Sequence, residues 1–288
     1  MGQKATNLTE QIELLRRRGM ILDFNIKKIE EILLDIGYYR LGFYWFPFSN
    51  SQTHDFIHDI KLSNILSLYY FDTDLKNLLT KYLTRFEINF RTKLIYEVSN
   101  TYSDSPTWFI DPSVVNKDFI DNFDKYYYTP SFKKNNLSIK KHHDKYINDK
   151  YAPAWKTIEF LTFGSILELF RALKEDSLKE IISKHYGIRT PNVFENHIRN
   201  IINIRNICAH NGVLFDYRSP KGIKNIPGLD INDRNRNSLE GVLKLVTFYI
   251  EKISVNRKKD FIAEIEKLKS ELNTNLAVKG IIAENIGL

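Results

Sequence analysis

Three side chains in the C-terminal third of the chain, Arg205, Asn206 and His210, have the types and spacing that RNA cleavage without a metal needs. Attack by the RNA's own 2′-hydroxyl requires that one proton be removed and another be given to the leaving 5′-oxygen. A histidine can do either near neutral pH. Arginine stays charged and can bind phosphate oxygens through two N–H groups, while an asparagine amide can orient the imidazole or hydrogen-bond the phosphate. These residues are therefore candidates for a catalytic site.

The same spacing also has a structural interpretation. A histidine near a helix C-terminus is often only a cap, and Arg205 can serve in a structural ion pair. The spacing by itself favours this second interpretation, because Arg-x4-His is a weak pattern. One motif supplies one histidine, so a two-histidine mechanism would need a second copy of the chain, and we would then expect a homodimer with a composite site.

The motif ends a predicted helix over Thr190–His210, with Thr190 as N-cap, Pro191 at the first helical position and Gly212 as the stop. At about 100° per residue, one stripe of this helix is apolar and the opposite stripe is polar. The apolar stripe holds Phe194, Ile198, Ile201, Ile204 and Cys208, and the polar stripe holds Glu195, Arg199, Asn203, Asn206 and His210. The helix dipole favours the imidazolium form of His210, which suits a general acid.

Arg205 lies off the polar stripe, so its charge must reach water, a phosphate or a buried acid. Glu87 and Glu159 are candidate acids, and spacing does not choose between them. Glu87 and Arg91, four residues apart on a predicted helix, are expected to form an ion pair.

Helical periodicity extends over most of the chain, and only 12 Gly and 8 Pro occur in 288 residues, so the sequence predicts an all-α protein. The predicted helices cover residues 6–18, 23–36, 62–98, 152–173, 177–186, 190–210, 237–254 and 257–272. Residues 62–98 form either one long helix or two with a kink, and Gly164-Ser165 interrupts the segment 152–173. The aromatic segment 38–48 is expected to pack onto the domain, with base stacking as the alternative. Residues 111–151 differ in composition. They suit either an RNA-contacting insertion or a solvated loop or helix pair.

Composition sets broad limits on function. Hydrophobic residues make up 43% of the chain and the net charge is +7, which permits a large core and a polyanionic partner. A single cysteine, a polar N-terminus and no long apolar run indicate a cytoplasmic protein without a membrane span. The pairs His142-His143 and His54-x3-His58 are expected to be exposed histidines, and neither a metal nor a cofactor is predicted.

Four blocks in order resemble the Abi-like family of bacterial abortive-infection proteins, in the HEPN superfamily. The blocks are Arg18-Gly19 with Ile36 to Leu41 and Pro47-Phe48; Asp74-Leu75 through Glu87 to Arg91-Thr92; Ala154-Trp155, Glu159 and Thr162 to Ser165; and Arg205 to Asn211. The Lys-rich stretch around 131–150 is the least family-like part. The resemblance covers most of the chain and is more specific than any one block.

The resemblance implies a HEPN-type helical bundle, often dimeric, with metal-independent ribonuclease activity at Arg205, Asn206 and His210. It also implies a role in phage defence by growth arrest or death of the infected cell, in the manner of a toxin. Some family members are thought to be held in check by a cognate small RNA. The family pattern leads us to expect a basic residue soon after the histidine and before an aromatic residue. This chain departs from the pattern, because Val213 and Leu214 precede Phe215.

The sequence therefore predicts three parts: an N-terminal helical and aromatic segment (1–50), a HEPN-like domain (51–256) with an insertion at about 111–151, and a C-terminal helix and tail (257–288). Residues expected to support the site are Glu87, Arg91 and Glu159, and residues expected to bind RNA are Arg199, Asn203, Arg218, Lys133, Lys134, Lys140 and Lys141. Two alternatives stay open: a non-catalytic or latent RNA-binding module, and a protein-interaction module that uses the aromatic segment.

Overall fold

A computed structural model of the chain describes residues 5–272 and 276–286, and within these residues the fold is all-α, as predicted. The helices are α1 (Leu8–Arg17), α2 (Ile26–Asp35), α3 (Tyr38–Trp45), α4 (Leu62–Thr101), α5 (Lys117–Tyr126), α6 (Pro130–Asn135), α7 (Leu137–Lys145), α8 (Ala154–Thr157), α9 (Phe163–Ala172), α10 (Asp176–Lys184), α11 (Pro191–Ala209), α12 (Leu239–Ile253), α13 (Val255–Glu271) and α14 (Leu276–Ile286). Short 3-10 helices are η1 (Phe46–Phe48), η2 (Trp108–Ile110) and η3 (Ile158–Phe160). None of these helices combines the length and apolar character of a membrane span.

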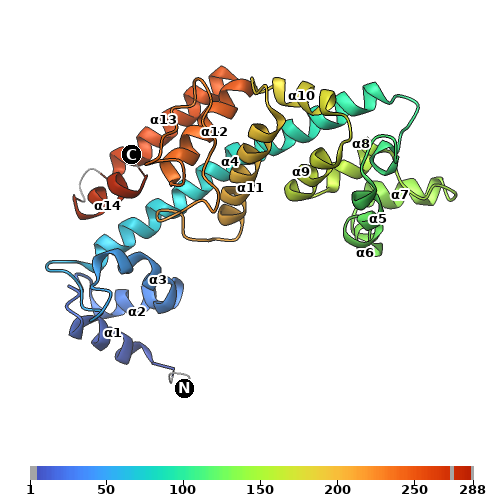
Figure 1. The fold of residues 1–288 in the computed structure, drawn as a ribbon. Coiled ribbons are helices and arrows are strands. Elements are labelled where there is room, and N and C mark those ends of the chain that lie inside the picture. The colour runs from blue at the N-terminus through green and yellow to red at the C-terminus, as the bar shows by residue number, and fades with distance from the viewer. Residues whose placement is uncertain (1–4, 273–275, 287–288) are drawn as a thin grey trace.

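Helix α4 is the axis of the molecule. Its 40 residues contain no Gly or Pro and extend for about 60 Å at 1.5 Å per residue. Figure 1 shows α1–α3 at its N-terminal end, α11 and α12 beside its middle, and α5–α8 near its C-terminal end. Helices α3 and α8 to α14 all contact it, so α4 places distant segments of the chain along one line.

Helix α11 packs as its sequence pattern predicts, because the whole apolar stripe from Phe194 to Cys208 is buried. Two polar side chains, His197 and Asn200, are buried beside this stripe. His197 Nε2 donates to the Lys224 carbonyl at 2.7 Å, and its Nδ1 lies 3.1 Å from the Tyr249 hydroxyl. Burial lowers the pKa of His197 to about 4.

The ends of α11 differ in detail from the prediction. Thr190 precedes the helix, but its side chain makes no capping hydrogen bond. At the C-terminus Asn211, not Gly212, takes the left-handed conformation, with φ 54°. Asparagine tolerates this region better than most residues. Gly212 is needed for space instead, because a Cβ there would lie 2.9 Å from Cγ2 of Ile207.

The segment 111–151 is neither a loop nor a helix pair: it forms the three helices α5, α6 and α7. Phe119, Phe123 and Tyr128 of this segment are buried and belong to the same hydrophobic core as the rest of the molecule. The segment is therefore packed onto the domain. Its His142 is also buried, contrary to the expected exposure, and its Nε2 lies 3.0 Å from Asp149 Oδ2.

The aromatic segment 38–48 packs only in part. Leu41, Tyr44, Trp45 and Phe48 are buried, as expected of a packing segment. Tyr39, Phe43 and Phe46 are exposed.

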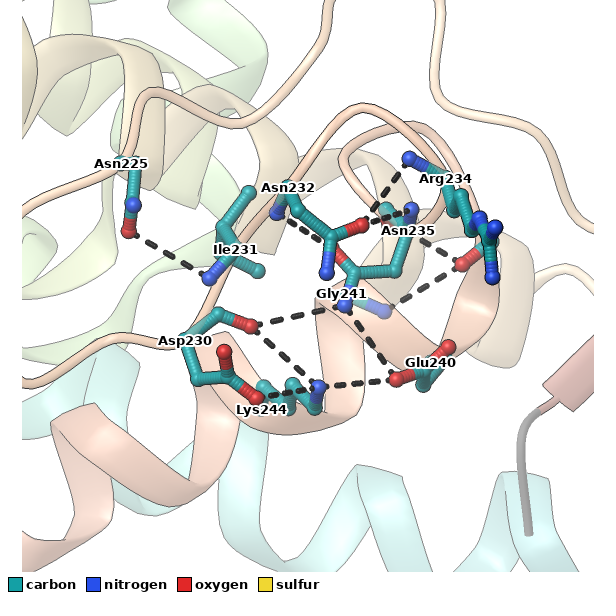
Figure 2. A network of polar contacts seen from close by, with 10 residues as sticks. Asn225, Asp230, Ile231, Asn232, Arg234, Asn235, Glu240, Gly241 and Lys244 are labelled. Atoms are coloured by element: carbon teal, nitrogen blue, oxygen red, sulfur yellow. Dashed lines mark hydrogen bonds and ion pairs between the residues drawn. The ribbon is translucent and has the colours of Figure 1, made fainter.

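A long loop links α11 to α12, and polar contacts fasten its last part (Figure 2). Lys244 of α12 pairs with Asp230 at 2.9 Å and with Glu240 at 2.8 Å. These carboxylates raise the pKa of Lys244, the bond to Glu240 most. The Asn235 side chain donates to Glu240 at 3.2 Å and accepts from the backbone N–H of Asn232 at 2.9 Å. The loop is thus tied to the first turns of α12.

Candidate functional site

The Arg205 guanidinium is bound to a carboxylate on one edge, and its side chain is partly exposed to solvent. Its Nε lies 3.3 Å from Glu87 Oε2, and its side chain is 36% exposed. Its Nη1 donates to the side-chain oxygen of Asn206 at 3.4 Å. A guanidinium fixed by a carboxylate in this way keeps N–H groups available for a phosphate.

Arg205 belongs to a chain of ion pairs that links α11, α4 and η3. Glu87 Oε1 accepts from Arg91 Nη2 at 3.0 Å, and both side chains are 10% exposed. Arg91 also donates to the Leu161 carbonyl at 3.2 Å, and its Nη1 lies 3.6 Å from Glu159 of η3. Of the two candidate acids, Glu87 contacts Arg205 directly, and Glu159 contacts it only through Arg91 and Glu87. Such a buried network fixes the position of the exposed arginine.

His210 follows the last residue of α11 and is exposed. Its backbone N–H donates to the Asn206 carbonyl at 2.9 Å, which places the two residues one turn apart. Within residues 5–272 and 276–286, no hydrogen bond or ion pair of the imidazole is formed, and no cluster of three metal-ligating side chains occurs. The ring is therefore open to a substrate.

The chain that leaves His210 is fastened to α4 by a buried carboxylate, Asp72. Its Oδ1 accepts the backbone N–H groups of Leu214 at 2.9 Å and Phe215 at 2.7 Å. Its Oδ2 accepts from the Tyr44 hydroxyl at 2.8 Å. Burial, and then the charge of Asp72, raise the pKa of Tyr44.

Two cations complete this anchor, which we call the Asp72 clamp. Lys76 lies 3.1 Å from Asp72, is almost fully buried, and donates to the Gly212 carbonyl at 3.3 Å. Arg40 of α3 donates to the Asn211 carbonyl at 2.6 Å. The residues directly after His210 are thus held from two helices.

Sequence reasoning missed the clamp, although a signal was present. Asp72 and Lys76 share a helical face with Leu68, Leu75 and Leu79, all buried. Charged residues on an apolar face need partners inside the protein.

The residues predicted to bind RNA do not gather around His210. Arg199 is bound to Glu195 at 2.8 Å, in a cluster with Arg171 and Glu168. Asn203 is half-buried near Tyr217, and burial raises the pKa of that tyrosine. Arg218 is exposed three residues after Phe215.

The four predicted lysines lie on α6 and α7, near the C-terminal end of α4 (Figure 1). Lys133 Nζ lies 5.4 Å from the ring centre of Tyr128, and Lys134, Lys140 and Lys141 are exposed. The structure therefore separates these lysines from the segment that holds Arg205 and His210.

The family model of the Abi-like proteins matches residues 31–216, which is more than half of the chain. This chain belongs to the Abi-like protein family. No curated protein and no solved structure matches it significantly.

The Abi-like match begins within α2 and ends one residue after the clamp. It therefore includes Arg40, the Asp72–Lys76 pair, the Glu87–Arg91 pair and the Arg205–His210 motif. It also includes the Lys-rich segment, while Arg18-Gly19 and helices α12–α14 lie outside it.

Proposed function

We propose that this Abi-like protein is a metal-independent endoribonuclease of the HEPN type, acting as a toxin-like abortive-infection effector in anti-phage defence. The observation that carries the proposal is that Arg205, half-buried and bound to Glu87, and the exposed His210 both lie at the end of the same helix. Family membership supports it.

In the proposed reaction, the RNA 2′-hydroxyl attacks the adjacent phosphorus and the bond to the 5′-oxygen breaks. A histidine takes the hydroxyl proton or supplies the proton to the leaving oxygen. Arg205 stabilises the negative charge on the phosphoryl oxygens through the N–H groups that Glu87 leaves free. Asn206, in contact with Arg205, orients the phosphate or the imidazole. The products are a 2′,3′-cyclic phosphate and a 5′-hydroxyl.

The single exposed histidine of each motif favours a homodimer that joins two motifs in one composite site, so that one His210 acts as base and the other as acid. RNA is the proposed substrate, a cognate small RNA is a proposed inhibitor, and the cytoplasm is the proposed location. Glu87, Arg91 and Glu159 act as support, because their ion pairs lead to Arg205.

The test is incubation of the purified full chain with total and structured RNA in excess EDTA. We expect cleavage by wild type that leaves cyclic phosphate ends, and loss of cleavage of about a hundredfold or more in His210→Ala and Arg205→Ala. His58→Ala and Arg257→Ala are matched controls, because both side chains are exposed and lie outside the motif. Thermal melting checks that each variant stays folded.

Retained cleavage by both motif variants would overturn the proposal. Salt-sensitive RNA binding without cleavage by any of the proteins would instead support the latent or non-catalytic RNA-binding module.

A further inference from the structure

A pocket of about 690 Å³ lies between α6, α7 and the turn that contains α8 and η3. Its lining includes Lys141, His142, Lys145, Tyr146, Lys156 and Phe160. Among all its lining residues, three are lysines and none is a carboxylate. The pocket is therefore locally more basic than the chain, in which 42 Lys and Arg face 35 Asp and Glu.

The pocket lysines also lack counter-charges. Elsewhere in the same segment Lys150 pairs with Asp124 at 2.9 Å. Within the described residues, Lys141, Lys145 and Lys156 form no ion pair with a carboxylate. The nearby Asp149 is bound to His142. Uncompensated positive charge in one pocket attracts a polyanion.

Aromatic rings lie beside these lysines. Tyr146 is 44% exposed and Phe160 is 39% exposed on the pocket wall. Trp155, next to Lys156 in the chain, is 53% exposed. Exposed rings beside lysines are the arrangement that binds single-stranded nucleic acid, in which bases stack and phosphates meet cations.

We propose that this pocket binds single-stranded RNA at a site separate from Arg205 and His210. The choice of RNA rests on the proposed function. The pocket is connected to that function through η3: Phe160 lines the pocket, and the preceding Glu159 lies 3.6 Å from Arg91 of the ion-pair chain. RNA held here has a second contact with the protein besides the motif, which raises the local concentration of substrate.

The site refines the set of lysines that the sequence suggested. Of Lys133, Lys134, Lys140 and Lys141, only Lys141 lines the pocket. Lys145 and Lys156 join it from the end of α7 and from α8.

The test measures RNA binding to the full chain carrying His210→Ala, so that no cleavage interferes. The probe is a fluorescein-labelled oligouridylate of about 12 nucleotides, read by anisotropy in EDTA over a range of salt. The pocket variant is Lys141→Ala/Lys145→Ala/Lys156→Ala. The control is Lys117→Ala/Lys125→Ala/Lys259→Ala, which removes the same charge from exposed lysines that do not line the pocket.

We expect the pocket variant to bind about tenfold or more weakly, and its salt slope to fall by about 2, since each lost phosphate contact removes about 0.7. The control triple should stay within about threefold of its parent. Phe160→Leu should weaken binding about fivefold or more without changing the slope, because it removes stacking and no charge.

Equal weakening by both triple variants would overturn the proposal, since binding would then depend on net charge alone. Stronger binding of anionic lipid vesicles than of RNA, lost in the pocket variant, would also overturn it. The proposed function is judged separately, from wild-type cleavage. A protein that cleaves nothing but loses RNA binding in the pocket variant would refute the nuclease and retain the pocket.

Discussion

The Asp72 clamp allows a quantitative prediction about the chain that leaves His210. The perturbation is Asp72→Asn, which keeps the size of the side chain and removes its charge. The amide oxygen can still accept the N–H groups of Leu214 and Phe215, but Lys76, 3% exposed, loses its anionic partner. The Gly212 carbonyl at 3.3 Å is then its only remaining partner among those observed in the described residues.

The expected loss of stability follows from that unpaired charge. Breaking a buried ion pair by removing one partner costs about 3–5 kcal/mol, so Asp72→Asn is expected to lower the free energy of unfolding by about 3 kcal/mol. Lys76→Met should cost less, about 1–2 kcal/mol, because Asp72 keeps its three hydrogen-bond donors, two backbone amides and Tyr44. The double variant should cost less than the sum of the two, with a coupling of about 1–3 kcal/mol.

The assay is urea unfolding of the four proteins, with the slope of each transition checked for constancy. Hydrogen exchange gives a local measurement, because the amides of Leu214 and Phe215 should exchange faster in Asp72→Asn. Asp74→Asn is the matched control: it lies two residues away on the same helix, is exposed, and should change stability by less than about 0.5 kcal/mol.

A stability of Asp72→Asn within about 0.5 kcal/mol of wild type would refute the clamp. Strictly additive effects in the double variant would refute the pairing of Asp72 with Lys76.

Three further predictions concern other buried groups. His197 has a pKa of about 4 in the folded protein against 6.5 when unfolded. The unfolded chain therefore takes up a proton first as pH falls, and urea unfolding from pH 7 to pH 4 should show a loss of about 3 kcal/mol that His197→Gln lacks. Gly241→Ala should lower stability by about 1–3 kcal/mol, since its Cβ would lie 2.1 Å from the Asn235 carbonyl oxygen. Gly164 lies in helix α9, and a Cβ added there would meet no neighbouring atom closer than 4.0 Å, so Gly164→Ala should not destabilise the protein. Equal losses of melting temperature in the two glycine variants would contradict this reasoning. Burial raises the pKa of Cys208 to about 12, so thiol reagents at pH 8 should react only after unfolding, and fast labelling of the native protein would show otherwise.

The sequence by itself determined the all-α fold class, most of the long helices and the faces of α11. Periodicity of apolar residues is local information, so the long helix near Leu62–Val98 and the buried stripe from Phe194 to Cys208 could be predicted before any contact was known. The same local pattern placed Arg205, Asn206 and His210 on one helix end, and the order of the motif blocks indicated the family that the match identifies. The division into parts at about residues 50 and 256 stays a prediction.

Only the tertiary structure decided which partners these residues take. Glu87 rather than Glu159 contacts Arg205, and Asp72 accepts from amides 142 and 143 residues away, because burial requires each polar group to find a partner wherever the packing provides one. The lysine-rich composition of α6 and α7 is typical of an RNA-binding surface. Helix α4 extends for about 60 Å, however, and the packing along it places these lysines away from His210. Spacing along the chain carries no information about such contacts, since they depend on how α4 brings remote segments together.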